Sequence, residues 1–221
     1  MNHADHQTAS PPPRLEHLDD ALELDRTDPL RSYRAAFHIP PRRAADDGPS
    51  IYLCGNSLGL QPRAAAELVQ SEMHAWAELG VEGHFHAATP WYTYHESVRD
   101  GLADVVGALP HEVVAMNTLT VNLHLLMVSF YRPTGRRTRI LMERPAFPSD
   151  RYAITTQLRT RDIDPIDALI EVGPRPDESC IRDEDIIDAI EQAGDELALV
   201  LLGGVNYYTG QVFDFPSITQ K

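Results

Sequence analysis

Hydrophobic positions along this chain follow two periods, and the pattern sharpens after residue 50. Short runs of apolar, often β-branched residues predict strands at 51–53, 113–116, 139–142, 169–172 and 197–202. Between them, apolar residues recur every three to four positions and predict helices over 62–80, 94–109, 121–131, about 150–157 and 181–193. Strands therefore alternate with helices along most of the chain.

This alternation has the spacing of βαβ units. It predicts an α/β fold with a mostly parallel sheet and helices on both faces, in which the all-apolar run 197–202 is a buried strand. Residues 1–13, which end in three prolines, are expected to be a disordered lead, and residues 14–50 an N-terminal segment. A further helix begins at Pro216, just before the sequence ends at Lys221. We therefore expect 51–221 to be the first part of a domain that is incomplete at its C-terminus.

Charge and composition exclude several classes of function. The chain has 33 acidic and 19 basic residues, a formal net charge of −14, which disfavours nucleic acids and anionic membranes as partners. Its longest apolar run is six residues, too short to span a bilayer, and its N-terminus lacks the pattern of a secretory signal. Its two cysteines are expected to be reduced thiols in a cytoplasmic protein. Any lysine chemistry has one candidate, Lys221.

The first candidate site is the turn that enters the helix predicted at 121–131. The N–H groups of Leu119 and Thr120, with the hydroxyls of Thr118 and Thr120, have the chemistry of a phosphate cradle at a helix N-terminus. Threonine and asparagine are also ordinary N-cap residues, so plain helix capping remains the alternative.

Two further candidates follow predicted strands, where ligands collect in open α/β sheets. In the segment 147–150, Phe147 could stack on a flat ring, and Asp150 could either pair with a ring nitrogen or cap the next helix. Gly203 and Gly204 follow the last strand and would allow a ligand to approach the backbone, although a tight turn needs glycines equally.

A histidine-rich segment gives a weaker metal hypothesis. His84 and His86 are spaced as two ligands on one side of a strand, with His95 and Glu96 further on, but no cysteine or carboxylate spacing supports a zinc site. We therefore predict no metal, and a histidine that faces substrate is the better interpretation. The chain contains no P-loop, GxGxxG or GxSxG motif.

Five blocks of sequence, in order, resemble the kynureninase family. They are Tyr52–Pro62, Gly83–Trp91, Met116–Leu126, Ala146–Ala153 and Gly204–Gln211. Each block alone is weak, but together they extend over about 160 residues and make a specific match.

The resemblance implies the large domain of a fold-type-I pyridoxal-phosphate (PLP) transferase-like enzyme. Such an enzyme is a homodimer that hydrolyses L-kynurenine, or its 3-hydroxy derivative, to anthranilate or 3-hydroxyanthranilate and L-alanine, in tryptophan catabolism and NAD biosynthesis. By this likeness Leu119 and Thr120 hold the cofactor phosphate and Phe147 stacks on the ring. Pro148, Ser149 and Asp150 shape that side, with the Asp150 carboxylate near the ring nitrogen. Ser57 and His84 are substrate-side positions. Gly203 is serine in some relatives.

One departure limits what the resemblance implies. The family's Schiff-base lysine lies well beyond the block that ends at Gln211, as do its Asp-x-x-His segment and the adjacent tyrosine, and Lys221 does not occupy that lysine position. No catalytic residue is therefore assigned, and the chain is expected to be inactive alone. Two alternatives stay open: a short, non-catalytic dimerisation partner, or another fold-type-I enzyme such as a cysteine desulfurase-like protein.

Overall fold

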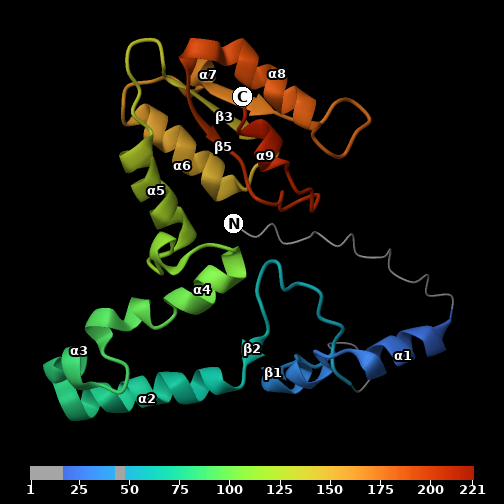
Figure 1. The fold of residues 1–221 in the computed structure, drawn as a ribbon, viewed down its shortest axis with the longest axis vertical. Coiled ribbons are helices and arrows are strands. Elements are labelled where there is room, and N and C mark those ends of the chain that lie inside the picture. Colours follow the sequence, from blue (N-terminus) through green and yellow to red (C-terminus); the bar gives the residue numbers. More distant parts are fainter. Residues whose placement is uncertain (1–16, 43–47) are drawn as a thin grey trace. The chain divides into compact units, whose positions relative to one another are not determined.

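A computed structural model of the chain describes residues 17–42 and 48–221. The predicted disordered lead, 1–13, lies outside the described residues. The chain divides into two compact units, one ending at Ser97 and the other beginning at Val98. Figure 1 labels most of the helices and strands of both units.

The first unit is mainly helical. Its elements are α1 (Leu18–Thr27), the 3-10 turn η1 (Arg31–Ala36), β1 (Phe37–His38), β2 (Gln61–Pro62), α2 (Ala64–Leu79), η2 (Gly80–Glu82), α3 (Gly83–His86) and η3 (Trp91–Glu96). The helix predicted at 62–80 is confirmed as α2. The strand predicted at 51–53 is wrong, because Ile51 and Leu53 are 79% and 84% exposed and have no sheet face to cover. The strand instead forms at Gln61–Pro62, antiparallel to Phe37–His38.

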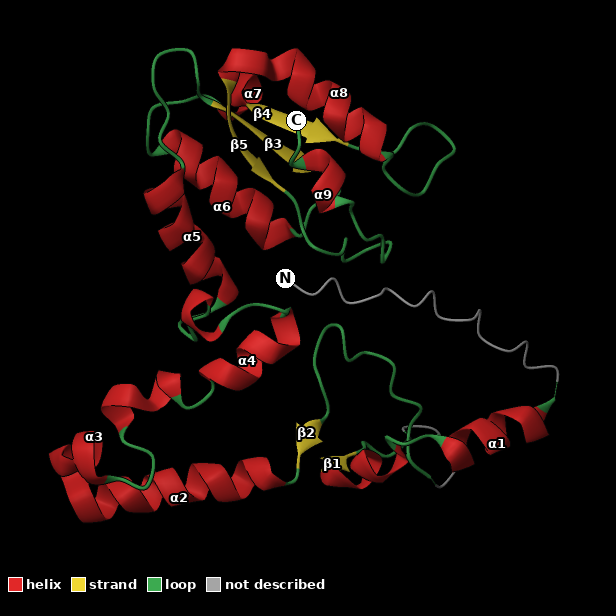
Figure 2. Ribbon diagram, viewed as in Figure 1, coloured by secondary structure: helices red, strands yellow, loops and turns green. Residues whose placement is uncertain are grey.

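The second unit contains the α/β part of the chain. Its elements are α4 (Arg99–Val106), η4 (Pro110–Glu112), α5 (Leu119–Phe130), β3 (Arg139–Glu143), α6 (Pro148–Arg159), α7 (Pro165–Ala168), β4 (Leu169–Val172), α8 (Asp183–Ala193), η5 (Gly194–Glu196), β5 (Leu197–Leu201) and α9 (Phe215–Ile218). The three strands form a parallel sheet in the order β4-β3-β5, drawn in yellow in Figure 2. The predicted parallel α/β architecture is confirmed.

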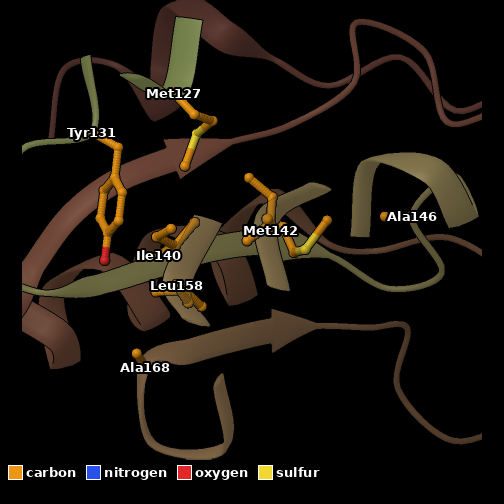
Figure 3. Close-up of a cluster of buried hydrophobic side chains, with 8 residues drawn as sticks. Met127, Tyr131, Ile140, Met142, Ala146, Leu158 and Ala168 are labelled. Atoms are coloured by element: carbon orange, nitrogen blue, oxygen red, sulfur yellow. The ribbon is translucent and has the colours of Figure 1, made fainter. Parts of the chain in front are cut away.

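Helices cover both faces of this sheet. One face packs on α5, α6 and α7 around a core of Met127, Tyr131, Ile140, Met142, Ala146, Ile154, Leu158 and Ala168, most of which Figure 3 labels. The other face packs on α8 and α9 around Leu141, Val172, Ile181, Ile186, Phe213 and Ile218. Residues of β3 alternate between the two cores, as a strand covered on both faces requires.

Three sequence predictions in this region need correction. Residues 113–116 form no strand, because no described strand pairs with them and they run directly from η4 towards α5. The helix predicted at 94–109 is divided between η3 and the shorter α4. The strand predicted as buried at 197–202 is β5, whose residues are only half-buried because it lies at the edge of the three-stranded sheet.

Candidate functional site

A pocket of about 290 Å³ lies at the carboxyl ends of β3 and β5. The starts of α5 and α6 contribute Leu119, Asn122 and Asp150, the end of β3 contributes Glu143, and the turn after β5 contributes Gly203. The structure thus brings together three positions from three separate predicted sites: Leu119, Asp150 and Gly203. Open parallel sheets bind ligands at this edge.

The start of α5 has unpaired hydrogen-bond donors. Thr118 is the N-cap and has extended backbone, but its side chain forms no capping hydrogen bond. Within the described part of the chain, the hydroxyls of Thr118 and Thr120 have no hydrogen-bond partner. The alternative that these threonines only cap the helix is therefore not supported by the structure. The first N–H groups of this twelve-residue helix, with the hydroxyl of the half-buried residue Thr120, remain free to bind an anion.

The segment 147–150 forms the start of α6. Pro148 occupies the first helical position, which fits its fixed backbone angle, and Phe147 is the N-cap. Phe147 is 49% exposed, and its ring and that of Tyr207 form a T-shaped pair with 5.1 Å between ring centroids. Phe147 therefore has an aromatic contact on one side while about half of the residue remains accessible.

The Asp150 carboxyl group does not cap α6. It lies in the pocket wall, where burial raises its pKa, while a 3.5 Å hydrogen bond donated by the Ser149 hydroxyl acts in the opposite direction. The net effect is a raised pKa, because the desolvation of the charged form is the larger influence.

Two pocket residues were missed by sequence reasoning. Glu143, the last residue of β3, accepts a 3.2 Å hydrogen bond from the Gly203 N–H through Oε1, while its Oε2 is buried without a partner. Asn122 donates from its side-chain amide to the Met116 carbonyl at 3.1 Å, and its Oδ1 is likewise buried without a partner. Nothing in the sequence pattern marked these positions, because a glutamate that ends a strand reads as a surface residue.

The absence of a side chain at Gly203 has a direct structural reason. A Cβ atom there would lie 3.2 Å from Glu143 Oε1 and 3.3 Å from the Val205 carbonyl oxygen. A side chain at this position would crowd the Glu143 carboxylate, so the glycine allows β3 and the turn after β5 to approach closely.

The turn after β5 is held by Asn206, which is only 3% exposed. Its amide nitrogen donates to the Pro145 carbonyl at 3.1 Å, and its oxygen accepts from the backbone N–H groups of Tyr208 and Thr209 at 3.0 and 3.1 Å. Asn206 thus ties the block 204–211 to the loop that leads into Phe147. This is a positioning role that the sequence did not reveal.

The two substrate-side candidates both lie in the first unit. Ser57 is exposed in a turn, where its N–H donates to the Cys54 carbonyl at 2.9 Å. His84 is exposed on α3, and its Nδ1 lies 2.9 Å from the Val81 carbonyl oxygen. Its ring meets Trp91 edge-on at 5.3 Å. Gly83 permits this packing, since a Cβ there would lie 2.4 Å from the Trp91 ring.

The metal hypothesis receives no support from the geometry. Within residues 17–42 and 48–221, no group of three or more histidine, cysteine, aspartate or glutamate side chains is arranged to hold a metal ion. His86 instead lies 3.5 Å from Glu82 and His95 lies 4.0 Å from Glu96.

Lys221 lies elsewhere in the second unit. Its ammonium group is 3.0 Å from Glu191 Oε1, and it lines a larger cavity of about 550 Å³ beside β5, α8 and α9. We regard the smaller pocket as the functional candidate, because it combines the free helix N-terminus of α5 with buried acceptors. The larger cavity has no comparable helix start, since α9 is a helix of only four residues. Among the described residues that line it, none has a buried acceptor without a partner.

Together these groups define what the pocket can bind chemically. The start of α5 favours an anion, and Glu143, Asn122 and Asp150 favour a molecule that presents hydrogen-bond donors. Phe147 does not line the pocket itself, but as the N-cap of α6, three residues before Asp150, it offers a half-exposed aromatic ring nearby. A flat molecule with a phosphate and protonated polar groups meets all three requirements.

Comparison with curated proteins finds close relatives named kynureninase. The protein from Myxococcus xanthus is 56% identical over 200 residues, which cover 90% of this chain and 46% of the relative. Those from Koribacter versatilis and Christiangramia forsetii are 52% and 54% identical over 200 residues, at similar coverage. The chain thus spans about half the length of the curated relatives it matches. No protein-family model matches it.

A solved structure has the same fold. It is titled a C-DES mutant with glycine covalently linked to the PLP cofactor, and its TM-score is 0.56 at 15% identity, over 75% of this chain and 40% of that one. At this identity the likeness shows the fold alone, and the predicted fold-type-I architecture is confirmed. No helix among the described residues is long and apolar enough to cross a membrane.

Proposed function

We propose that this relative of the kynureninases forms the phosphate-binding side of a pyridoxal 5′-phosphate site, and that it serves in the hydrolysis of L-kynurenine or 3-hydroxy-L-kynurenine. The observation that carries the proposal is the single pocket that gathers Leu119, Asp150 and Gly203 from three separate segments. The curated relatives, at 52–56% identity, support the reaction class.

The residues present fit this cofactor on chemical grounds. The free N–H groups at the start of α5 suit a phosphate, and the two orphaned acceptors, Glu143 Oε2 and Asn122 Oδ1, suit a ring that carries hydrogen-bond donors. A purely apolar ligand would leave both acceptors without a partner, which is energetically costly.

Each cofactor-side residue then has a defined task. Leu119 and Thr120 bind the phosphate through their N–H groups and the Thr120 hydroxyl. Phe147 covers a face of the ring, and Pro148 and Ser149 fix the direction in which α6 begins. The Asp150 carboxylate would accept a hydrogen bond from a protonated ring nitrogen and so stabilise positive charge there. Bound pyridoxal phosphate supplies the electron sink for cleavage of the carbon–carbon bond.

Substrate and partner assignments belong to the same proposal. Ser57 and His84 are proposed to contact the small-molecule substrate, kynurenine, and the full-length enzyme is proposed to be a cytoplasmic homodimer. Cys54 and Cys180 are both unpaired and exposed, which suits a reducing compartment.

The position of Lys221 supports a second part of the proposal, namely that this chain does not catalyse the reaction by itself. Lys221 is paired with Glu191 and is not among the residues that line the proposed cofactor pocket. We expect no release of anthranilate from kynurenine by this chain, although it binds the cofactor. A binding or dimerisation role for the isolated chain would be compatible with this expectation.

The test is the affinity of purified chain for pyridoxal 5′-phosphate, measured by equilibrium dialysis. Thr120→Val removes the hydroxyl but keeps the shape, and we expect it to weaken binding roughly tenfold, the usual effect of losing one hydrogen bond to a charged group. Thr155→Val makes the same change at a half-buried position in the middle of α6, where the hydroxyl donates to the Arg151 carbonyl at 2.8 Å, and not at the start of α5. Equal loss in both variants, or none in Thr120→Val, would contradict the proposal.

A further inference from the structure

We propose that Glu143 is a ligand-contacting residue of the pocket, whose Oε2 accepts a hydrogen bond from a donor group of bound pyridoxal 5′-phosphate. The inference rests on the proposed function and adds a residue that neither the motifs nor the relatives assign.

The two oxygens of the Glu143 carboxyl group have different surroundings. Glu143 is 6% exposed and ends the central strand of the sheet, beside the turn that follows β5. Oε1 accepts from the Gly203 N–H at 3.2 Å, whereas Oε2 has no hydrogen-bond partner among the described residues. One oxygen therefore has a structural role, and the other is available.

The pocket itself offers this oxygen no donor from a side chain. Among the described residues that line the pocket, Asn122 alone has a side-chain donor, and it directs its amide nitrogen to the Met116 carbonyl, leaving its own Oδ1 unpartnered. The remaining lining side chains are apolar or are the carboxylate of Asp150.

A buried acceptor without a donor destabilises a folded protein, and buried polar groups are almost always paired. Sites that bind ligands are a recognised exception, because the missing partner belongs to the ligand. Two such acceptors in one pocket, with anion-binding N–H groups at its edge, indicate a ligand that carries an anionic group and hydrogen-bond donors on the same small frame.

The test compares Glu143→Gln with the parent chain in two measurements. The glutamine keeps an oxygen for the Gly203 N–H and places an amide N–H₂ group where Oε2 was. Because the hydrogen bond from the Gly203 N–H is preserved, the melting temperature without ligand should equal that of the parent chain. With pyridoxal 5′-phosphate, the new donor meets the ligand's donor, and the affinity should fall at least tenfold.

Inorganic phosphate is the second probe, because it needs only the start of α5. Glu143→Gln should not weaken phosphate binding, whereas Thr120→Val should weaken the binding of both ligands. Glu184→Gln removes the same charge at an exposed position of α8 and serves as the matched control.

The outcomes separate the two proposals. If the parent chain binds no pyridoxal 5′-phosphate, the proposed function and the inference fail together. If the parent chain binds it and Glu143→Gln binds it equally well, the inference alone is overturned. A lower melting temperature in Glu143→Gln than in Glu184→Gln, with weaker binding of both ligands, would show that Glu143 is only a structural tie, and that also overturns it.

Discussion

At Asp150, burial and a serine hydroxyl act on one carboxyl group in opposite directions. Burial has the larger effect and raises the pKa above its usual value of 3.8, and the hydrogen bond from Ser149 reduces that rise. A raised pKa means that folding disfavours the ionised form. The resulting cost is absent at a pH below 3.8, where the folded and unfolded chains are both protonated, and it is complete above the raised pKa.

Asp150→Asn should therefore change stability in a pH-dependent way. At neutral pH the variant lacks the ionised group and should gain stability relative to the parent chain, and this gain should shrink as the pH falls through the raised pKa towards 3.8. Urea unfolding across this range measures the difference. Asp188→Asn, at an exposed position of α8, is the control. A difference that is the same at every pH would show that the charge of Asp150 is not responsible.

At the scale of elements, the turn after β5 is fixed by one buried amide. Asn206 is hydrogen-bonded to the loop before α6 and to two N–H groups of its own turn, and Tyr207 beside it contacts Phe147. The packing of β5 against β3 therefore determines how the aromatic face at the start of α6 is presented. The turn after β5 thus links the position of β5 to the position of Phe147 at the start of α6.

Asn206→Ala should lower the free energy of unfolding by about 2–4 kcal/mol, because it leaves the Pro145 carbonyl and two backbone N–H groups without their partner. Chemical denaturation provides the measurement. Gln192→Ala, which removes an exposed amide from α8, should cost less than about 0.5 kcal/mol. Similar values for the two variants would mean that the Asn206 hydrogen bonds contribute little.

The same elements show how far the sequence could be interpreted. The strands at 139–142 and 169–172 could be predicted because both are short runs of mainly apolar residues, a pattern that holds for the buried central strand β3 and for the half-buried edge strand β4 alike. The predicted strands at 51–53 and 113–116 failed because strand formation needs a distant partner, which local pattern does not reveal. Leu119 could be proposed from its place at the start of a predicted helix, and Asp150 from its place after a predicted strand. Glu143 could not, since its role depends on Gly203, sixty residues away.

At the scale of the whole molecule, sheet order determines where chemistry can occur. With β3 between β4 and β5, the start of α6 and the turn after β5 meet at one edge of the sheet, and the start of α5 completes the pocket. Lys221 is held instead by Glu191, beside the cavity at α8 and α9. A phosphate-bearing cofactor bound at the start of α5 can therefore be distinguished from one bound beside α9 and Lys221.

Hydrogen exchange of the intact chain, read by mass spectrometry with and without pyridoxal 5′-phosphate, tests the central claim most directly. The first N–H groups of α5 have no partner within the helix and should exchange rapidly in the free chain. We predict that the cofactor slows exchange in peptides that contain residues 119–121 and 202–204. No protection there, or protection confined to the peptides around α9 and Lys221, would contradict the account.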